Sequence, residues 1–347
     1  MQTAKRRYDI DWIRVIAIGL LIIYHAAIGF QPWGMMIGFI STEKSWVSLW
    51  IPMSMLNVWR IPLLFFVSGM GIYFAMQKRS WKELLRERAQ RIFVPYVFGI
   101  FCIVPIHFLI WQYYYRMETA YVPNPAHLWF LGNIFVYVLI FMPLFYYLKR
   151  HENGRVTGIL KKIMCSPVGM LFAVGCFIVE VQVVNPQPYE LYAMTPHGFF
   201  LGMLAFLFGF LFVFSGDGFW GMMVKERWLF FMLAISLFGM RTAGFYFPVS
   251  TMLLPVETVC WVLTVFAFGH RYLNRPGKAI QYLSQAAYPV YILHMIFLYL
   301  GAMLIFQLNI PAPLQFAGIV VFTLTGCFGV YEGIRRVAWL RLLFGLK

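Results

Sequence analysis

Long apolar runs separated by short polar stretches dominate this sequence of 347 residues. A helix needs about 20 apolar residues to cross the hydrocarbon layer of a bilayer. Runs close to that length extend from Trp12 to Phe30, Leu49 to Met76, Phe93 to Tyr115, His127 to Leu148, Val168 to Asn185, His197 to Phe214, Trp228 to Phe247, Leu254 to His270, Ala286 to Gln307 and Leu314 to Ile334. This pattern predicts an all-α, polytopic integral membrane protein with about ten transmembrane helices.

The composition supports the same fold class. The chain is 61% hydrophobic and only 12% charged, so a soluble core could not bury its apolar surface. Its net charge of +15 would suit a nucleic-acid partner, but short basic loops between apolar runs are also what the positive-inside rule produces. We therefore expect the lipid bilayer as a partner and no nucleic acid.

The positions of the basic residues predict an orientation. If the N-terminus is cytoplasmic, the 28 Lys and Arg residues lie in or beside the inner segments, with the exceptions of Arg14, Lys44, Arg60, Arg116 and Arg241. Both termini are then cytoplasmic. No polar stretch is long enough for a second folded domain, so residues 1–347 are expected to form a single transmembrane domain.

The first apolar run contains two ionisable side chains, Arg14 and His25. A charged group in a membrane span costs roughly 2.5 to 3.5 kcal/mol, so its presence suggests a function. The two residues are eleven positions apart, about three helical turns, and therefore share one helix face. The simpler alternatives are a histidine bonded to a neighbouring helix and an arginine that reaches the headgroups or pairs with Asp11.

A basic stretch, "QKRSWKELLRERAQR", occupies residues 77–91 and is expected to form a short amphipathic helix. Its Arg86, Arg88 and Arg91 could bind the phosphates of a cytosolic cofactor, because a guanidinium group presents a planar fork of donors. An ordinary positive-inside loop that binds anionic lipid explains the same charges.

Further polar side chains inside the runs are candidates for substrate binding. His127 begins the fourth run, where a position in an interfacial aromatic belt is the alternative. His294 lies in the middle of the ninth run with Tyr291 one turn away, and a structural hydrogen bond is its alternative. Arg60, Arg241 and Glu257 could also contact a substrate, although opposite charges inside a membrane are expected to pair with one another.

Several enzyme classes have no support in the sequence. It contains no GxSxG, Walker or HExxH motif, so hydrolase, ATPase and zinc-protease functions are not indicated. The five cysteines form no C-x-x-C pair, and we expect neither a disulfide framework nor a metal site.

An ordered set of motifs resembles the membrane acyltransferase family 3. The set comprises the D-x-D-W-x-R start with Arg14 ahead of His25, "FFVSG" at 65–69, "RERAQRIFVPY" at 86–96, "HLWFL" at 127–131 and "YPVYILH" at 288–294. "FGHRYLN" at 268–274 and the closing "YEGIRRVAWLRLLFG" look similar to the branch that includes the periplasmic glucan succinyltransferase.

The resemblance implies an enzyme of the cell inner membrane. Such an enzyme moves an acyl group from cytoplasmic acyl-CoA, either acetyl-CoA or succinyl-CoA, to a hydroxyl of an extracytoplasmic glycan. The essential histidine of the family corresponds to His25, its arginine partner to Arg14, and its R-x-R feature to Arg86 and Arg88. The resemblance does not identify the acyl group, the glycan or the oligomeric state.

The residue chemistry agrees with this function. A sugar hydroxyl attacks a thioester slowly unless a positioned base removes its proton, and a histidine, whose ordinary pKa lies near about 6.5, is suited to that role. We expect His25 to be the general base, although an acyl-histidine intermediate also fits. The main alternative function is a polytopic transporter or exporter of a sugar or an anionic metabolite, and a lipid-modifying enzyme is another.

Overall fold

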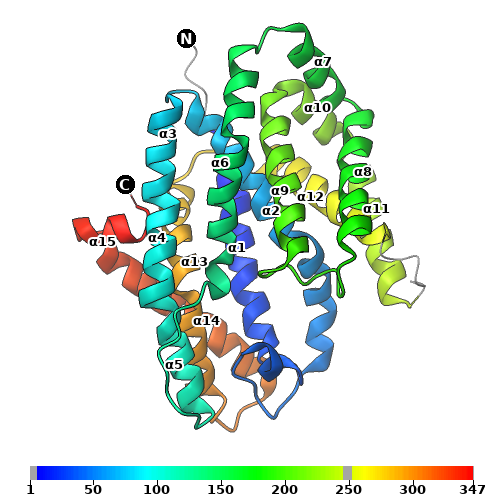
Figure 1. Ribbon diagram of the computed structural model, residues 1–347. Helices are drawn as coiled ribbons and strands as arrows, with labels where there is room; N and C mark the ends of the chain where they lie inside the picture. Colours follow the sequence, from blue (N-terminus) through cyan, green and yellow to red (C-terminus); the bar gives the residue numbers. More distant parts are fainter. Residues whose placement is uncertain (1–5, 245–251, 347) are drawn as a thin grey trace. The chain divides into compact units, whose positions relative to one another are not determined.

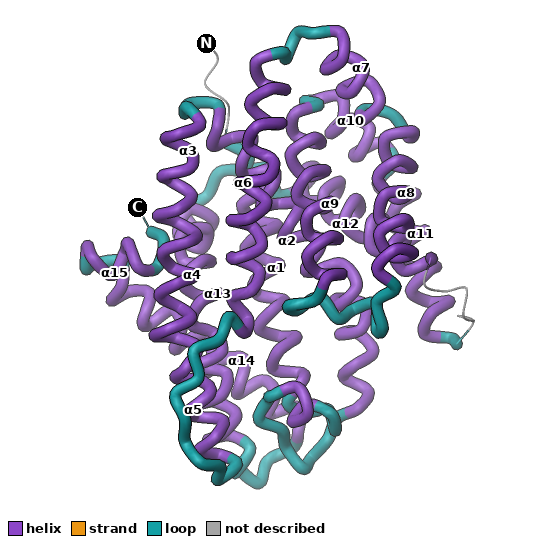
Figure 2. The backbone as a smooth tube through the Cα atoms, in the orientation of Figure 1, coloured by secondary structure: helices purple, strands orange, loops and turns teal. Residues whose placement is uncertain are grey.

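The computed structural model describes residues 6–244 and 252–346, and in these residues it contains helices and loops but no strand (Figures 1 and 2). The α-helices are α1 (Tyr8–Ile28), α2 (Trp50–Met76), α3 (Trp81–Arg88), α4 (Val94–Phe98), α5 (Val104–Tyr114), α6 (Trp129–Arg150), α7 (Arg155–Met164), α8 (Pro167–Val184), α9 (Pro196–Phe214), α10 (Asp217–Lys225), α11 (Arg227–Thr242), α12 (Leu253–Tyr272), α13 (Lys278–Ile305), α14 (Ala312–Ile334) and α15 (Ala338–Leu343). The predicted all-α fold class is confirmed.

Nine helical runs within the described ranges are long and apolar enough to cross a bilayer. They are α1, the run Val47–Met76 that ends in α2, the run Trp81–Tyr114 from α3 to α5, the run Ala126–Arg150 that ends in α6, and the single helices α8, α9, α12, α13 and α14. The remaining predicted span, residues 228–247, begins in α11, and its last residues lie outside the described ranges. The protein is thus a polytopic membrane protein.

In the basic stretch at residues 77–91, where a short amphipathic helix was expected, the chain is helical from Trp81 onward, and this helix continues into the third span. The helix starts at Trp81 and runs to Tyr114 through two π-helical segments, Ala89–Phe93 and Gly99–Ile103. Pro95 and Pro105 follow these segments. Because proline has no N–H for the carbonyl four residues earlier, a π turn allows the helix to continue through each site.

The chain divides into two compact units. The first comprises the described residues of 1–14, 57–87 and 133–280. Within it α2 and α9 are in very close contact, because a Cβ atom added to Gly69 would lie 1.9 Å from the Phe206 carbonyl oxygen, and one added to Gly209 would lie 2.0 Å from that of Phe66. The "FFVSG" motif therefore supplies a helix–helix contact that only glycine permits.

The second unit comprises the described residues of 15–56, 88–132 and 281–347. After α1 ends, the segment 29–49 folds back on itself, with the Trp46 N–H donating to the Phe30 carbonyl at 2.9 Å. Its middle is held by Tyr115, whose hydroxyl donates to the Phe39 carbonyl at 3.2 Å and accepts from the Ser41 N–H at 3.1 Å. Figure 2 shows how much of this part is loop. These contacts place Phe39 beside the last turn of α1.

Candidate functional site

A pair of histidines lies at the centre of the second unit. His25 is in the last turn of α1, and His294 is in the middle of α13. The Nδ1 atom of His25 is 2.9 Å from Nε2 of His294, which is a hydrogen-bond distance. The two rings are almost parallel, with 11° between their planes and 5.1 Å between their centroids. His294 is fully buried, whereas His25 is partly exposed.

His127 and Tyr291 secure the same part of α13. The Tyr291 hydroxyl donates to the His127 carbonyl. In the reverse direction, Nε2 of His127 is 3.1 Å from the Ile292 carbonyl and donates to it. The His127 ring meets the His294 ring edge-on, at a centroid distance of 5.1 Å. The structure therefore brings together four of the predicted site residues, namely His25, His127, Tyr291 and His294.

His107 is a further member of this group that the sequence analysis did not identify. It lies in α5, fully buried, with its ring 5.5 Å from that of His127 and 5.2 Å from that of Tyr299. A histidine inside an apolar run was the available signal, and the same signal had identified His294. Among the described residues, no group of three or more His, Cys, Asp or Glu side chains is arranged to hold a metal ion.

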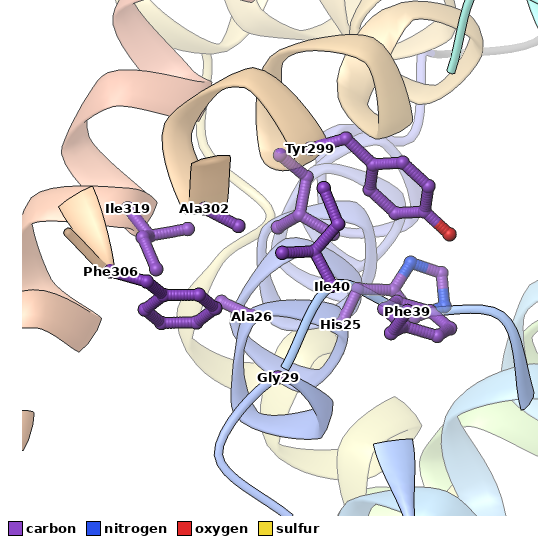
Figure 3. A pocket seen from close by; sticks show the side chains of 10 residues that line it. His25, Ala26, Gly29, Phe39, Ile40, Tyr299, Ala302, Phe306 and Ile319 are labelled. Carbon is purple, nitrogen blue, oxygen red and sulfur yellow. The ribbon is translucent and has the colours of Figure 1, made fainter. Parts of the chain in front are cut away.

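A small cavity of about 10 Å³ opens beside His25 (Figure 3). That is close to the smallest volume that holds one water molecule. Figure 3 shows the rings of His25, Phe39 and Tyr299 on one side and the apolar side chains of Ala302, Phe306 and Ile319 on the other. The full lining is His25, Ala26, Gly29, Phe39, Ile40, Leu298, Tyr299, Ala302, Phe306 and Ile319.

The polar atoms of this lining are few. The Tyr299 hydroxyl is engaged outside the cavity, because it donates to the Gly38 carbonyl at 2.6 Å. Gly38 has a φ of +85°, a conformation that favours glycine and that turns the chain toward Tyr299. Among the described side chains that line the cavity there is no lysine or arginine. The cavity is therefore an apolar recess with an imidazole at its side.

Four of the six arginines of the predicted site, those assigned to catalysis and donor binding, have different environments. Arg14 is 2.6 Å from Asp11 one turn earlier, and 41% of its side chain is exposed, so the predicted pairing with Asp11 is present. Arg86 is exposed, and Arg88 and Arg91 are half-buried. Arg14 and Arg86 belong to the first unit, and Arg88 and Arg91 to the second.

The end of the chain packs against the arginine-bearing helix within the second unit. Arg91 donates from Nε to the Gly345 carbonyl at 3.3 Å, and the Phe344 and Phe98 rings meet at 5.5 Å. Gly345 has a φ of +65°, and a Cβ atom there would lie 2.6 Å from the Arg91 carbonyl oxygen and 2.7 Å from the Tyr288 ring. A glycine at this position lets the chain end reach Arg91.

Arg60, Arg241 and Glu257 all lie in the first unit. Two nitrogens of Arg241, Nε and Nη2, each donate to one Glu257 oxygen at 2.9 Å, and Glu257 is fully buried. The predicted pairing of opposite charges is therefore present for this pair. Arg60 is buried in α2.

The sequence analysis missed a second polar cluster, at the start of α1. Asp9 is fully buried and accepts hydrogen bonds from Nε of Arg7 at 2.9 Å and from Nδ1 of His270 at 2.8 Å. The Arg7 guanidinium also lies over the Trp220 ring, 4.0 Å from its centroid. Asp9 belongs to the D-x-D-W-x-R start, but its partner His270 on α12 is 261 residues away in sequence.

Comparisons with known protein sequences assign this chain to a family. The sequence profile of a family described as an acyltransferase domain matches residues 7–332. Glucans biosynthesis protein C of Shigella dysenteriae serotype 1 is 23% identical over 376 residues, an alignment that covers 99% of this chain and 95% of that protein. Its counterpart from Escherichia coli strain K12 / DH10B is 23% identical over 378 residues, with the same coverage of both chains. No solved structure matches the chain significantly.

The profile begins before α1 and ends in α14, so it contains both histidines of the central pair and the helices that carry them. The resemblance seen in the ordered motifs is thereby confirmed, and this polytopic chain belongs to the membrane acyltransferase family 3.

Proposed function

We propose that the protein is a membrane O-acyltransferase that moves an acyl group from cytoplasmic acyl-CoA to a hydroxyl of an extracytoplasmic glycan. The observation that carries the proposal is the contact between His25 and His294 beside an apolar recess. Membership of the acyltransferase family supports the reaction class, and the relatives named glucans biosynthesis protein C support a glycan as the acceptor.

His25 acts as the general base. As the acceptor oxygen attacks the thioester carbonyl carbon, the hydroxyl proton passes to the imidazole, and the C–S bond then breaks. The imidazolium returns the proton to the departing sulfur, so the products are the O-acyl ester and coenzyme A. A neighbouring group that accepts a hydrogen bond from the other ring nitrogen orients such a base.

The acyl group is acetyl or succinyl, and the apolar recess beside His25 receives the part of it nearest the reacting carbon. A succinyl carboxylate is charged, and burying it without a cationic partner is costly. Because none of the described side chains that line the recess is a lysine or an arginine, such a carboxylate would lie outside the recess.

The arginines bind the donor. Arg86, Arg88 and Arg91 hold the phosphates of acyl-CoA, since guanidinium groups pair with phosphate oxygens in a planar, bidentate manner. Arg14, near the start of α1, binds polar groups of the donor. His127 and Tyr291 in the second unit contact the substrates, and Arg60, Arg241 and Glu257 in the first unit are further candidates for substrate binding.

We further propose that the whole chain is one catalytic domain of the bacterial inner membrane, with both termini in the cytoplasm. The support is the placement of its basic residues under the positive-inside rule. Acyl-CoA then approaches from the side that carries Arg86, Arg88 and Arg91, and the glycan from the other side.

The proposal is tested by measuring release of the coenzyme A thiol from acetyl-CoA by the purified protein in the presence of a periplasmic glucan. His25→Ala is expected to reduce this release by at least about 100-fold, because a general base contributes 10²–10⁴-fold. The matched control is His151→Ala, which removes an exposed histidine outside the site. Undiminished release by folded His25→Ala protein would remove His25 as the base.

The same assay separates an enzyme from a transporter. A transporter would carry labelled substrate into sealed vesicles without consuming the thioester. Transport without release of thiol by the unmodified protein would therefore overturn the acyltransferase proposal.

A further inference from the structure

We propose that His294 is a positioning residue that fixes the tautomer of His25, so that Nε2 of His25 carries the lone pair that removes the substrate proton. This inference rests on the proposed role of His25 as the base, and adds to it which atom reacts and what orients it. One chain of hydrogen bonds runs from the Tyr291 carbonyl through His294 in α13 to His25 in α1.

The first link fixes the protonation of His294. Its Nδ1 atom is 2.6 Å from the Tyr291 carbonyl oxygen, one turn earlier in α13. A carbonyl oxygen only accepts hydrogen bonds, so Nδ1 must carry the hydrogen. A neutral imidazole has one N–H, and Nε2 of a neutral His294 is therefore an acceptor.

The second hydrogen bond determines the tautomer of His25. Nε2 of His294 is 2.9 Å from Nδ1 of His25. Because Nε2 is the acceptor, Nδ1 of His25 must be the donor and must carry that ring's hydrogen. The lone pair of a neutral His25 then lies on Nε2, the nitrogen on the opposite side of the ring.

The opposite tautomer of His25 could not act as the base. If His294 were protonated, Nε2 would donate to Nδ1 of His25, and the hydrogen of His25 would lie on Nε2. The base would then present an N–H to the substrate hydroxyl. A neutral His294 is therefore a requirement of the proposal.

The surroundings hold His294 in place. Its ring lies nearly parallel to His25 and edge-on to His127. The Tyr291 hydroxyl and Nε2 of His127 connect α13 to the segment before α6 in both directions. The carbonyl that selects the tautomer thus belongs to a turn that is anchored on either side.

Two substitutions distinguish positioning from packing. In His294→Gln the side-chain oxygen can still accept from Nδ1 of His25, whereas His294→Phe keeps a ring but offers no acceptor. We expect His294→Phe to lower kcat by about 10- to 100-fold with little change in KM, as is usual when the group that orients a histidine is lost. His294→Gln is expected to recover a large part of that loss. His151→Phe and His151→Gln are the matched controls.

A spectroscopic measurement tests the tautomer directly. In protein labelled with ¹⁵N-histidine, His25 is assigned by the signal that disappears in His25→Gln. The His25 signal is expected to show protonated Nδ1 and unprotonated Nε2 in the unmodified protein and in His294→Gln, and to shift toward the other tautomer in His294→Phe. The His151 variants should leave this signal unchanged.

The outcomes separate the two proposals. Loss of activity in His25→Ala combined with full activity and an unchanged tautomer in His294→Phe would overturn the role of His294 and leave His25 as the base. A protonated Nε2 on His25 in the unmodified protein would likewise overturn the assignment of the reacting atom. Full activity in His25→Ala would instead contradict the proposed function itself.

Discussion

At the scale of single residues, the proposed acyl transfer depends on which side chains lie beside the apolar recess. His25 was recognisable in the sequence because a titratable group inside a membrane span is costly and suggests a function. Its partner His294 was identified separately for the same reason, but their contact was not. They are 269 residues apart, and a hydrogen bond between them depends on how α1 and α13 pack.

The size of the recess leads to a prediction about acyl preference. Ile319 is buried in its wall, and Ile319→Ala should enlarge it enough for a longer acyl chain. One methylene in such a pocket is worth roughly 10-fold or more in kcat/KM. We expect the unmodified protein to prefer acetyl-CoA over propionyl-CoA by about that factor, and the variant to lose most of the preference.

The control for this prediction is Ile280→Ala, which truncates another fully buried isoleucine outside the recess. It should lower stability in a similar way and leave the ratio of acetyl to propionyl transfer unchanged. An Ile319→Ala variant with an unchanged ratio would contradict the placement of the acyl chain in the recess.

At the scale of helices, close packing explains motifs that carry no chemistry of their own. The "FFVSG" motif ends at Gly69, and a second glycine, Gly71, follows two residues later. The structure singles out Gly69, where a Cβ atom would meet the Phe206 backbone, whereas one at Gly71 would have nothing within 4 Å. Periodicity identifies the helix, but only the packed structure shows which glycine lies at the contact.

A pair of substitutions in α2 tests this difference. Gly69→Ala should force α2 and α9 apart and destabilise the protein by roughly 3 kcal/mol, because the clash is with backbone that cannot move aside. Gly71→Ala should be neutral or stabilising by up to about 1 kcal/mol, since alanine favours the helix. Thermal unfolding in detergent measures both, and equal effects would show that the contact at Gly69 is not the cause.

At the scale of the whole molecule, the positions of the basic residues support both the proposed orientation in the membrane and the proposed cytoplasmic donor. Basic residues gather in the segments assigned to the cytoplasm, and Arg86, Arg88 and Arg91 lie on one continuous helical run, Trp81–Tyr114. That run gives the arginines a fixed spacing, which a flexible loop would not. The arrangement suits a phosphate-bearing donor from the cytoplasm.

The corresponding prediction concerns the donor. Replacing Arg86 and Arg88 together by alanine should raise KM for acetyl-CoA by about 10-fold or more, since a hydrogen bond to a charged group contributes about 1.5–3 kcal/mol. The effect on kcat should be small. The control replaces Arg155 and Lys162, two exposed cations of α7, and equal KM values for both double variants would make the arginines topology signals only.

By itself, the sequence determined the fold class, the approximate spans and the family, because apolar run length and the order of short motifs are local properties of the chain. It also identified most of the polar residues of the central cluster, since each is conspicuous inside an apolar run. His107 carried the same local signal and was overlooked, whereas the contact between Asp9 and His270 was missed because nothing local in the sequence distinguishes it.

The tertiary structure decided what these residues do together. The contact between His25 and His294 and the small recess beside Ile319 each join segments that are distant in sequence. Helix periodicity sets the face on which a side chain lies, but the neighbour that it meets is set by how the helices pack. For that reason the histidine pair and the recess, on which our proposals rest, could be found only in the folded chain.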